Sequence, residues 1–88
     1  MSSQHQLEFR LHQHARKGGK THRYRQIQRV RRFLRWADMP AHNVGKRQVH
    51  EFYRSECRSK TMRRDYYYAF RLLWRALGRD SNPPRPDE

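Results

Sequence analysis

Apolar residues recur along this chain with the period of an α-helix, and no stretch alternates apolar and polar residues for long. The pattern predicts four helices, over about residues 3–16, 21–38, 46–56 and 61–78. Gly18 and Gly19 separate the first two segments, and Pro40 ends the second, because glycine and proline break helices. The expected fold is therefore all-α, a compact four-helix bundle.

Within the second segment, one stripe is apolar at helical spacing and is expected to be buried: Tyr24, Ile27, Val30, Leu34 and Ala37. The third segment has an equivalent inward face that ends with Cys57, which is expected to be a small buried hydrophobe. The first segment is less regular, because its Phe9 does not share the face of Leu7 and Leu11.

The last segment holds three consecutive tyrosines that cannot share one side of a helix. Tyr66 falls on the apolar arc that contains Phe70 and Leu73, so we expect it in the core. Tyr67 and Tyr68 lie about 100° and 200° further round, among arginines. They are expected either to face a ligand or to be exposed and cover neighbouring helices.

Local signals set the expected helix ends and the organisation of the chain. Thr21 and Thr61 are good N-caps for the second and fourth helices, and Gly78 marks the end of the fourth. We expect an N-terminal helix and glycine-containing linker, a helical DNA-binding core, and a proline-rich tail that is disordered or links to another domain. These parts are residues 1–19, 20–78 and 79–88.

The charge balance indicates a polyanionic partner. Lys and Arg number 21 against 8 acidic residues, for a formal net charge of +13, and this excess works against folding by self-repulsion. Nucleic acid is the first expectation, ahead of an acidic membrane surface or an acidic protein. Basic residues, two tyrosines and the threonine caps on the second and fourth helices form the predicted DNA-binding site: Lys20, Thr21, Arg25, Arg29, Arg32, Lys60, Thr61, Arg64, Tyr67, Tyr68, Arg71 and Arg75.

Other chemistry is not indicated. The one cysteine excludes an internal disulfide, and the 6 histidines form no CxxC- or HExxH-type spacing, so we expect no metal and no cofactor. The chain has no apolar run of about 20 residues and no signal-peptide core at its start, so it is expected to be cytoplasmic, associated with the nucleoid or a mobile element. A tyrosine nucleophile would need a closed site that a small helical bundle does not offer.

Three stretches resemble the SAM-like core-binding domain of tyrosine recombinases and phage integrases, with integron integrases as the nearest branch. They are KTHRYRQIQRVRRFLRWA, VGKRQVHEFYRS and SKTMRRDYYYAFRLLWRALG, and the resemblance covers residues 7–78. It lies in threonine caps and hydrophobic spacing. The positions that correspond are mostly structural: Thr21, Tyr24, Phe33, Thr61, Ala69 and Leu73.

The resemblance implies a helical module that clamps one face of a recombination site in double-stranded DNA. The family's catalytic domain, with its Arg, Lys, His and Tyr set, is absent from this chain, so no enzymatic activity is expected. The chain is then a fragment or a freestanding relative, with a recombinase catalytic domain or other protomers as further partners. The alternative is a basic helical module that binds RNA or an acidic protein.

Overall fold

Four α-helices and one short 3₁₀ turn make up the computed structural model, which describes residues 3–15 and 19–86. These elements are α1 Ser3–His14, α2 Lys20–Ala37, η1 Ala41–Asn43, α3 Lys46–Glu56 and α4 Lys60–Ala76. Neither described range contains a β-strand. The predicted all-α fold of four helices is confirmed, and the third helix has the predicted bounds.

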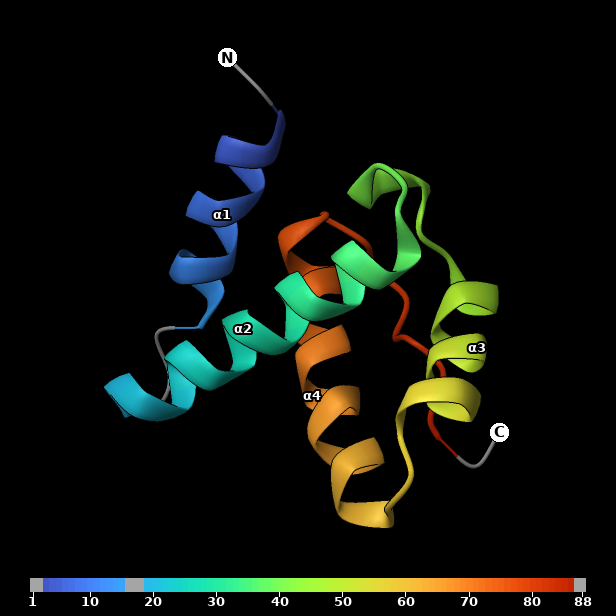
Figure 1. Cartoon of the computed structure of the whole chain (residues 1–88). Helices are drawn as coiled ribbons and strands as arrows, with labels where there is room; N and C mark the ends of the chain where they lie inside the picture. The colour runs from blue at the N-terminus through green and yellow to red at the C-terminus, as the bar shows by residue number, and fades with distance from the viewer. Residues whose placement is uncertain (1–2, 16–18, 87–88) are drawn as a thin grey trace.

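The centre of the bundle is the crossing of α2 over α4, which pack against each other (Figure 1). On one side, α1 packs against both α4 and α2. On the other side, α3 and the C-terminal segment lie next to one another. The first helix is therefore part of the same packed unit as the rest, and its Leu11 is fully buried.

Aromatic rings fill most of the core. The ring centroids of Phe33 on α2 and Phe70 on α4 are 4.6 Å apart, and Phe52 on α3 lies 5.2 Å from Phe33. The ring of Tyr66 is 4.8 Å from that of Phe52. Because only 34% of the residues are hydrophobic, a few large rings supply the apolar surface that such a small core needs.

The helical phase predicted for α4 is confirmed. Tyr66 is 3% exposed, Tyr67 is half-buried and Tyr68 is 48% exposed. Burial extends beyond the predicted arc, because Leu72, Trp74 and Ala76 are also buried. The packing of α1 against α4 adds a second covered side to the helix, which its sequence alone does not reveal.

The stripe predicted for α2 is partly wrong. Ile27 and Val30 are buried as expected, but Tyr24 is 62% exposed, and Phe33 and Gln26 are buried instead. The buried side of α2 is thus rotated away from Tyr24 and toward Phe33, whose ring packs 4.6 Å from that of Phe70 on α4.

Both predicted threonine caps are wrong. Gly19, with an extended backbone, precedes α2, so Thr21 lies inside the first turn. Ser59 caps α4 by accepting a hydrogen bond from the backbone N–H of Met62 at 3.1 Å. At the other end, Gly78 has a φ of 76°, as the prediction of a glycine stop requires.

The described part of the C-terminal tail packs onto the bundle. Pro83 and Pro84 are buried, and the Tyr53 hydroxyl donates a hydrogen bond to the Pro84 carbonyl oxygen at 3.1 Å. The prediction of a disordered tail is therefore wrong for this segment. Prolines exclude a helix, but they are compatible with an extended segment held against α3.

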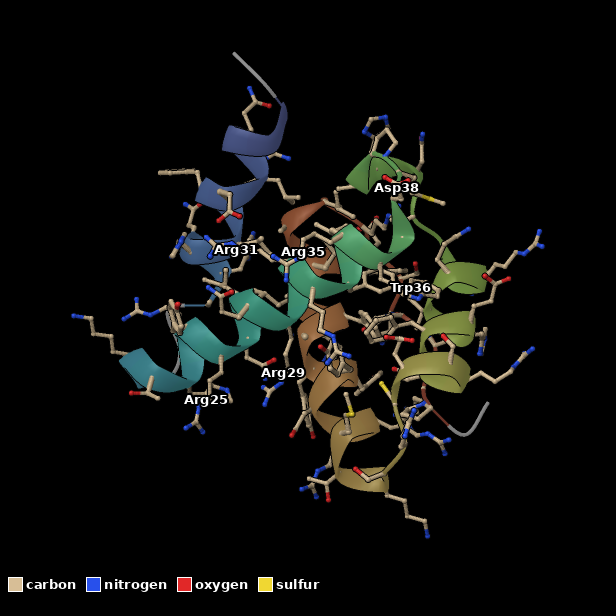
Figure 2. All side chains as sticks on the ribbon, viewed as in Figure 1. Arg25, Arg29, Arg31, Arg35, Trp36 and Asp38 are labelled. Atoms are coloured by element: carbon tan, nitrogen blue, oxygen red, sulfur yellow. The ribbon has the colours of Figure 1, made fainter. Side chains whose placement is uncertain are left out.

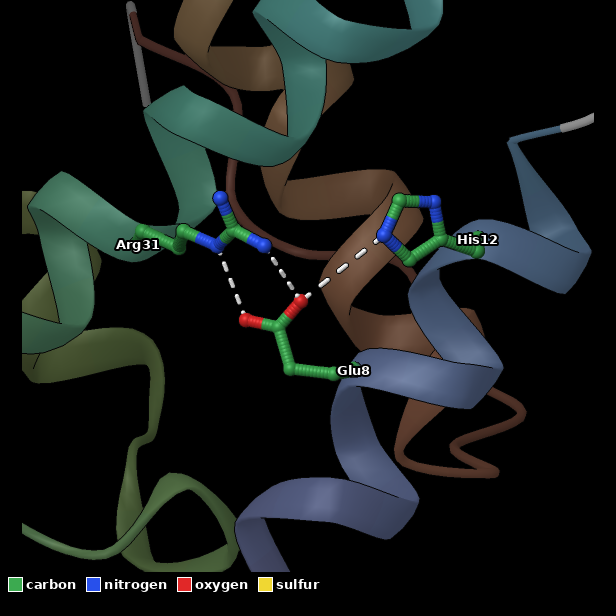
Figure 3. Close-up of polar contacts among 3 residues, drawn as sticks. All are labelled: Glu8, His12 and Arg31. Atoms are coloured by element: carbon green, nitrogen blue, oxygen red, sulfur yellow. Dashed lines mark hydrogen bonds and ion pairs between the residues drawn. The ribbon is translucent and has the colours of Figure 1, made fainter.

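A polar clasp joins α1 to α2 (Figure 3). The guanidinium of Arg31 donates two hydrogen bonds to the Glu8 carboxylate, at 2.8 and 2.7 Å, and His12 Nε2 lies 3.9 Å from the same group. Accepting these bonds, Glu8 raises the pKa of Arg31 further above its ordinary value. This two-point contact fixes how α1 sits on the bundle.

Candidate nucleic-acid interface

Two arginines of the predicted DNA-binding set form ion pairs with acidic side chains of the bundle. Arg29 Nη2 lies 3.6 Å from Asp65 Oδ2, and Arg32 Nη2 lies 3.5 Å from Glu56 Oε1. Both arginines belong to the predicted DNA-binding set. Each is therefore already engaged with a carboxylate of a neighbouring helix, which weakens its attraction for an external phosphate.

Arg32 is tied further into the bundle by Tyr66. Its guanidinium lies 6.0 Å from the centroid of the Tyr66 ring, and its Nη1 donates to the tyrosine hydroxyl at 3.5 Å. Burial raises the pKa of Tyr66, although Arg32 opposes this change. The neutral phenol of Tyr66 thus contacts the cation of Arg32 where α2, α3 and α4 meet. Through this contact Arg32 supports the packing of the bundle.

The remaining basic residues of the predicted set have no carboxylate partner within the described ranges. All are exposed except Arg71, which is half-buried. They are Lys20 and Arg25 on α2, and Lys60, Arg64, Arg71 and Arg75 on α4. Thr61 is also exposed, in the first turn of α4 beside Lys60. These side chains keep their full charge available for a partner.

The arginines of α2 divide between two edges of the helix. Figure 2 shows Arg25 and Arg29 on the edge that faces the N-terminal half of α4, and Arg31 and Arg35 on the opposite edge. Trp36, near the C-terminal end of α2, packs its ring 5.2 Å from that of Phe52. It is partly buried and packs against the core.

A groove between α2 and α4 gathers several of these side chains. Arg23 and Gln26 line it from α2, and Tyr68, Arg71 and Arg75 line it from α4. The end of α1 closes one side, and the groove has a volume of about 390 Å³. We call this concavity the Gln26 groove. It brings three predicted site residues together with two that the sequence did not single out.

Arg23 and Gln26 share the core-facing side of α2, so the outward-facing row of basic residues does not include them. Both residues precede Ile27 and Val30, which are the first fully buried residues of α2. There the side chains reach the edge of the α2–α4 contact and line an open groove. A polar residue in phase with an apolar stripe is the signal that would have identified them.

Two tyrosines border the same surface. The rings of Tyr67 and Tyr68 are 5.7 Å apart in an edge-to-face arrangement. This contact holds Tyr68 while leaving about half of it open to solvent. An exposed ring fixed among arginines can stack on a base or donate its hydroxyl to a phosphate.

No His, Cys, Asp or Glu cluster of the size that holds a metal ion occurs among residues 3–15 and 19–86. None of the helices in these ranges combines the length and apolarity needed to cross a bilayer. Comparisons with protein-family models, curated proteins and solved structures find no match for this chain. The resemblance to recombinase core-binding domains stays a prediction, and the surface chemistry carries the functional inference.

Proposed function

We propose that this chain binds double-stranded DNA through α4 and the N-terminal half of α2. The observation that carries the proposal is the set of cations on these two helices that have no carboxylate partner among the described residues, two of which, Arg71 and Arg75, line a groove with the exposed Tyr68. Arginine forks bind phosphate oxygens, and release of counterions from DNA makes such contacts favourable. The carboxylates of Glu8, Glu56 and Glu51 pair with Arg31, Arg32 and Arg47, so they do not neutralise these cations.

The spacing on α4 suits a duplex. Arg64, Tyr68, Arg71 and Arg75 lie on one side of the helix at spacings of three and four residues. At 1.5 Å per residue, the row is about 16 Å long. This length spans about five base-pair steps of B-DNA, and the major groove is wide enough to admit an α-helix. With the basic residues of α2, about four to six phosphates are within the reach of such a face.

In the recombinase interpretation, this face holds one side of a recombination site, and catalysis belongs to a separate domain. The chain itself then supplies affinity and positioning, with no bond made or broken. RNA and an acidic protein are the alternative partners, and the test below separates them from duplex DNA.

The test is a fluorescence anisotropy titration with a duplex of about 20 base pairs, two helical turns, at several salt concentrations. Single-stranded DNA and duplex RNA of the same sequence are titrated in parallel. For four to six phosphates we expect log affinity to fall with log salt at a slope of about −4 to −5. Tighter binding to duplex RNA, or no binding to any nucleic acid, would replace the proposal with an alternative.

Arg64 provides the matched variant because it is exposed, unpaired among the described residues and outside the Gln26 groove. Arg64→Ala should reduce the magnitude of the salt slope by about one. The control is Arg54→Ala, which removes an exposed arginine of α3. Equal effects of the two variants would show that net charge, and not this face, determines binding.

A further inference from the structure

A second groove lies along the other edge of α2, where Figure 2 shows Arg31 and Arg35. It is lined from α1, the C-terminal half of α2, the segment that contains η1, and the end of α4. Figure 1 shows α1 and α2 diverging toward this region, and the groove has a volume of about 700 Å³. We call it the Met39 groove.

The apolar part of this lining is only partly covered by the bundle. Half-buried side chains from several elements pack against the core and also line the groove: Leu7, Leu34, Met39 and Leu77. Single apolar side chains at a protein surface are ordinary, but their meeting in one groove creates a surface that an apolar partner can cover. The methionine adds adaptability, because its flexible thioether fits irregular apolar shapes.

The rest of the lining carries excess positive charge. Arg10 on α1 and Arg35 on α2 are exposed and have no carboxylate partner within residues 3–15 and 19–86. Arg10 also reaches the end of α4, where its Nη1 donates to the Ala76 carbonyl oxygen at 3.5 Å. Glu8 supplies the one carboxylate in the described lining, and it is paired with Arg31. Cations therefore stand on both helices that border the apolar lining.

We propose that the Met39 groove binds an acidic amphipathic segment of a partner protein. Apolar side chains of the segment cover Leu34 and Met39, and its carboxylates pair with Arg10 and Arg35. Such a segment matches the lining in both charge and apolarity, and burial of the apolar surface contributes affinity that does not depend on salt.

Other anions match this groove less well. The described lining contains no Phe, Tyr or Trp on which a base could stack, and a sugar–phosphate backbone would cover its leucines with polar groups. A fatty acid has the apolar chain but a single carboxylate, whereas the cations come from both α1 and α2. A protein segment that presents several carboxylates around apolar side chains satisfies both sides.

The test uses fluorescence anisotropy titrations of the full chain with labelled peptides of about 15 residues, four helical turns. The first peptide has leucines at helical spacing with glutamates on either side. The second has glutamine in place of every glutamate, and the third has serine in place of every leucine. We expect the first to bind at least about tenfold more tightly than either of the others. Equal binding of the first peptide and either of the others would overturn the inference, as would binding of dodecanoate but of no peptide.

Arg35→Glu is the decisive variant, because it reverses an exposed charge and should leave the fold intact. It should weaken binding of the first peptide by about tenfold or more. Arg54→Glu makes the same change of net charge on α3, outside the groove, and should have a much smaller effect. Equal losses from the two variants would overturn the inference, since they would show attraction by net charge alone.

Met39→Gln tests the apolar lining, because it keeps the length of the side chain and adds a polar amide. It should weaken the first peptide and leave the weak binding of the serine peptide unchanged. Met62→Gln changes a half-buried methionine of α4 that lies outside the groove, so it should bind the first peptide as the parent does. A Met39→Gln protein with parental affinity would remove the apolar contact from the inference and so overturn it.

The inference does not depend on the proposed function, because Arg25 and Arg29 lie on the opposite edge of α2 from Arg31 and Arg35. Duplex and peptide should bind together at physiological salt, where the repulsion between them is screened over about 8 Å. Full displacement of the peptide by duplex DNA would assign the groove to the DNA-binding face and overturn the inference. Selective peptide binding without duplex binding would leave it standing and remove the proposed function, and the reverse result has the opposite meaning.

Discussion

Asp65 Oδ2 on α4 lies 3.6 Å from Arg29 Nη2 on α2. The contact holds one of the predicted DNA-binding arginines against a carboxylate. Both side chains are partly open to solvent, so the pair is weak in stability terms. Its main consequence is electrostatic, because it places a negative charge beside a surface whose other charges are positive.

Asp65→Asn should therefore raise the affinity for duplex DNA several-fold, by removing a charge that repels phosphate and by freeing Arg29. The gain should be smaller in an Arg29→Ala background, and anisotropy titrations of the four proteins measure the difference. Glu51→Gln is the control, since it also breaks an ion pair but lies on α3. If the control raises affinity as much, the gain reflects net charge only.

The burial of the tyrosines on α4 could be predicted because it depends on one helical period. Once Phe70 and Leu73 are assigned to the core, Tyr66 must be inside and Tyr68 outside. Which residues of α2 are buried depends on how another helix packs against it. Tyr24 fits the same period as Ile27, yet the buried side of α2 is rotated toward Gln26 and Phe33, and Tyr24 is exposed. Periodicity gives the side of a helix that is apolar, but not which part of that side a neighbouring helix covers.

The sequence predicts that α2 and α4 carry basic residues, but not which of these side chains pair with acids or lie together. The partners of Arg29 and Arg32 come from α4 and α3, far away in the sequence, and no local pattern reveals such pairs. For the same reason the meeting of Gln26 with Tyr68 follows only from the packing of α2 on α4. Composition also could not distinguish a disordered proline-rich tail from one that packs, as Pro84 does.

Substitutions in the core and on the proposed face should have separate effects. Leu73 is fully buried, so Leu73→Ala should lower the free energy of unfolding by about 2–5 kcal/mol. Arg71→Ala should change it by no more than about 0.5 kcal/mol while weakening DNA binding. Urea unfolding followed by circular dichroism measures both. A comparable loss of stability from the two variants would show that Arg71 supports the fold.

The clasp between Glu8 and Arg31 should hold α1 in place. Glu8→Gln and Arg31→Met each break it, and a double-mutant cycle should give a coupling of about 0.5–1 kcal/mol, because the contact is bidentate but partly exposed. Hydrogen exchange should show faster exchange of α1 amides in both variants. Arg35→Met, a neighbouring exposed arginine on α2, serves as the control. Unchanged exchange in α1 would mean that Leu11 packing alone retains the helix.

Cys57 should make stability depend on alkaline pH. Burial raises the pKa of its thiol to about 11, although Arg32 and Arg63 oppose the change. A pKa that is higher in the folded than in the unfolded protein stabilises the fold below the unfolded value, and the contribution disappears as pH rises through the folded one. The free energy of unfolding should thus fall from pH 9 to pH 11.

Cys57→Ala should show a shallower fall over this interval, and denaturant titrations of both proteins across the range measure the difference. Tyr66, whose pKa burial also raises, is present in both proteins, and the Cys57 charge is a lesser cause of its shift. At pH 8 the folded parent should react slowly with iodoacetamide, because only the thiolate is nucleophilic and the sulfur is buried. Rapid labelling of the folded protein, or identical pH profiles for the two proteins, would contradict a protonated thiol sealed between α3 and α4.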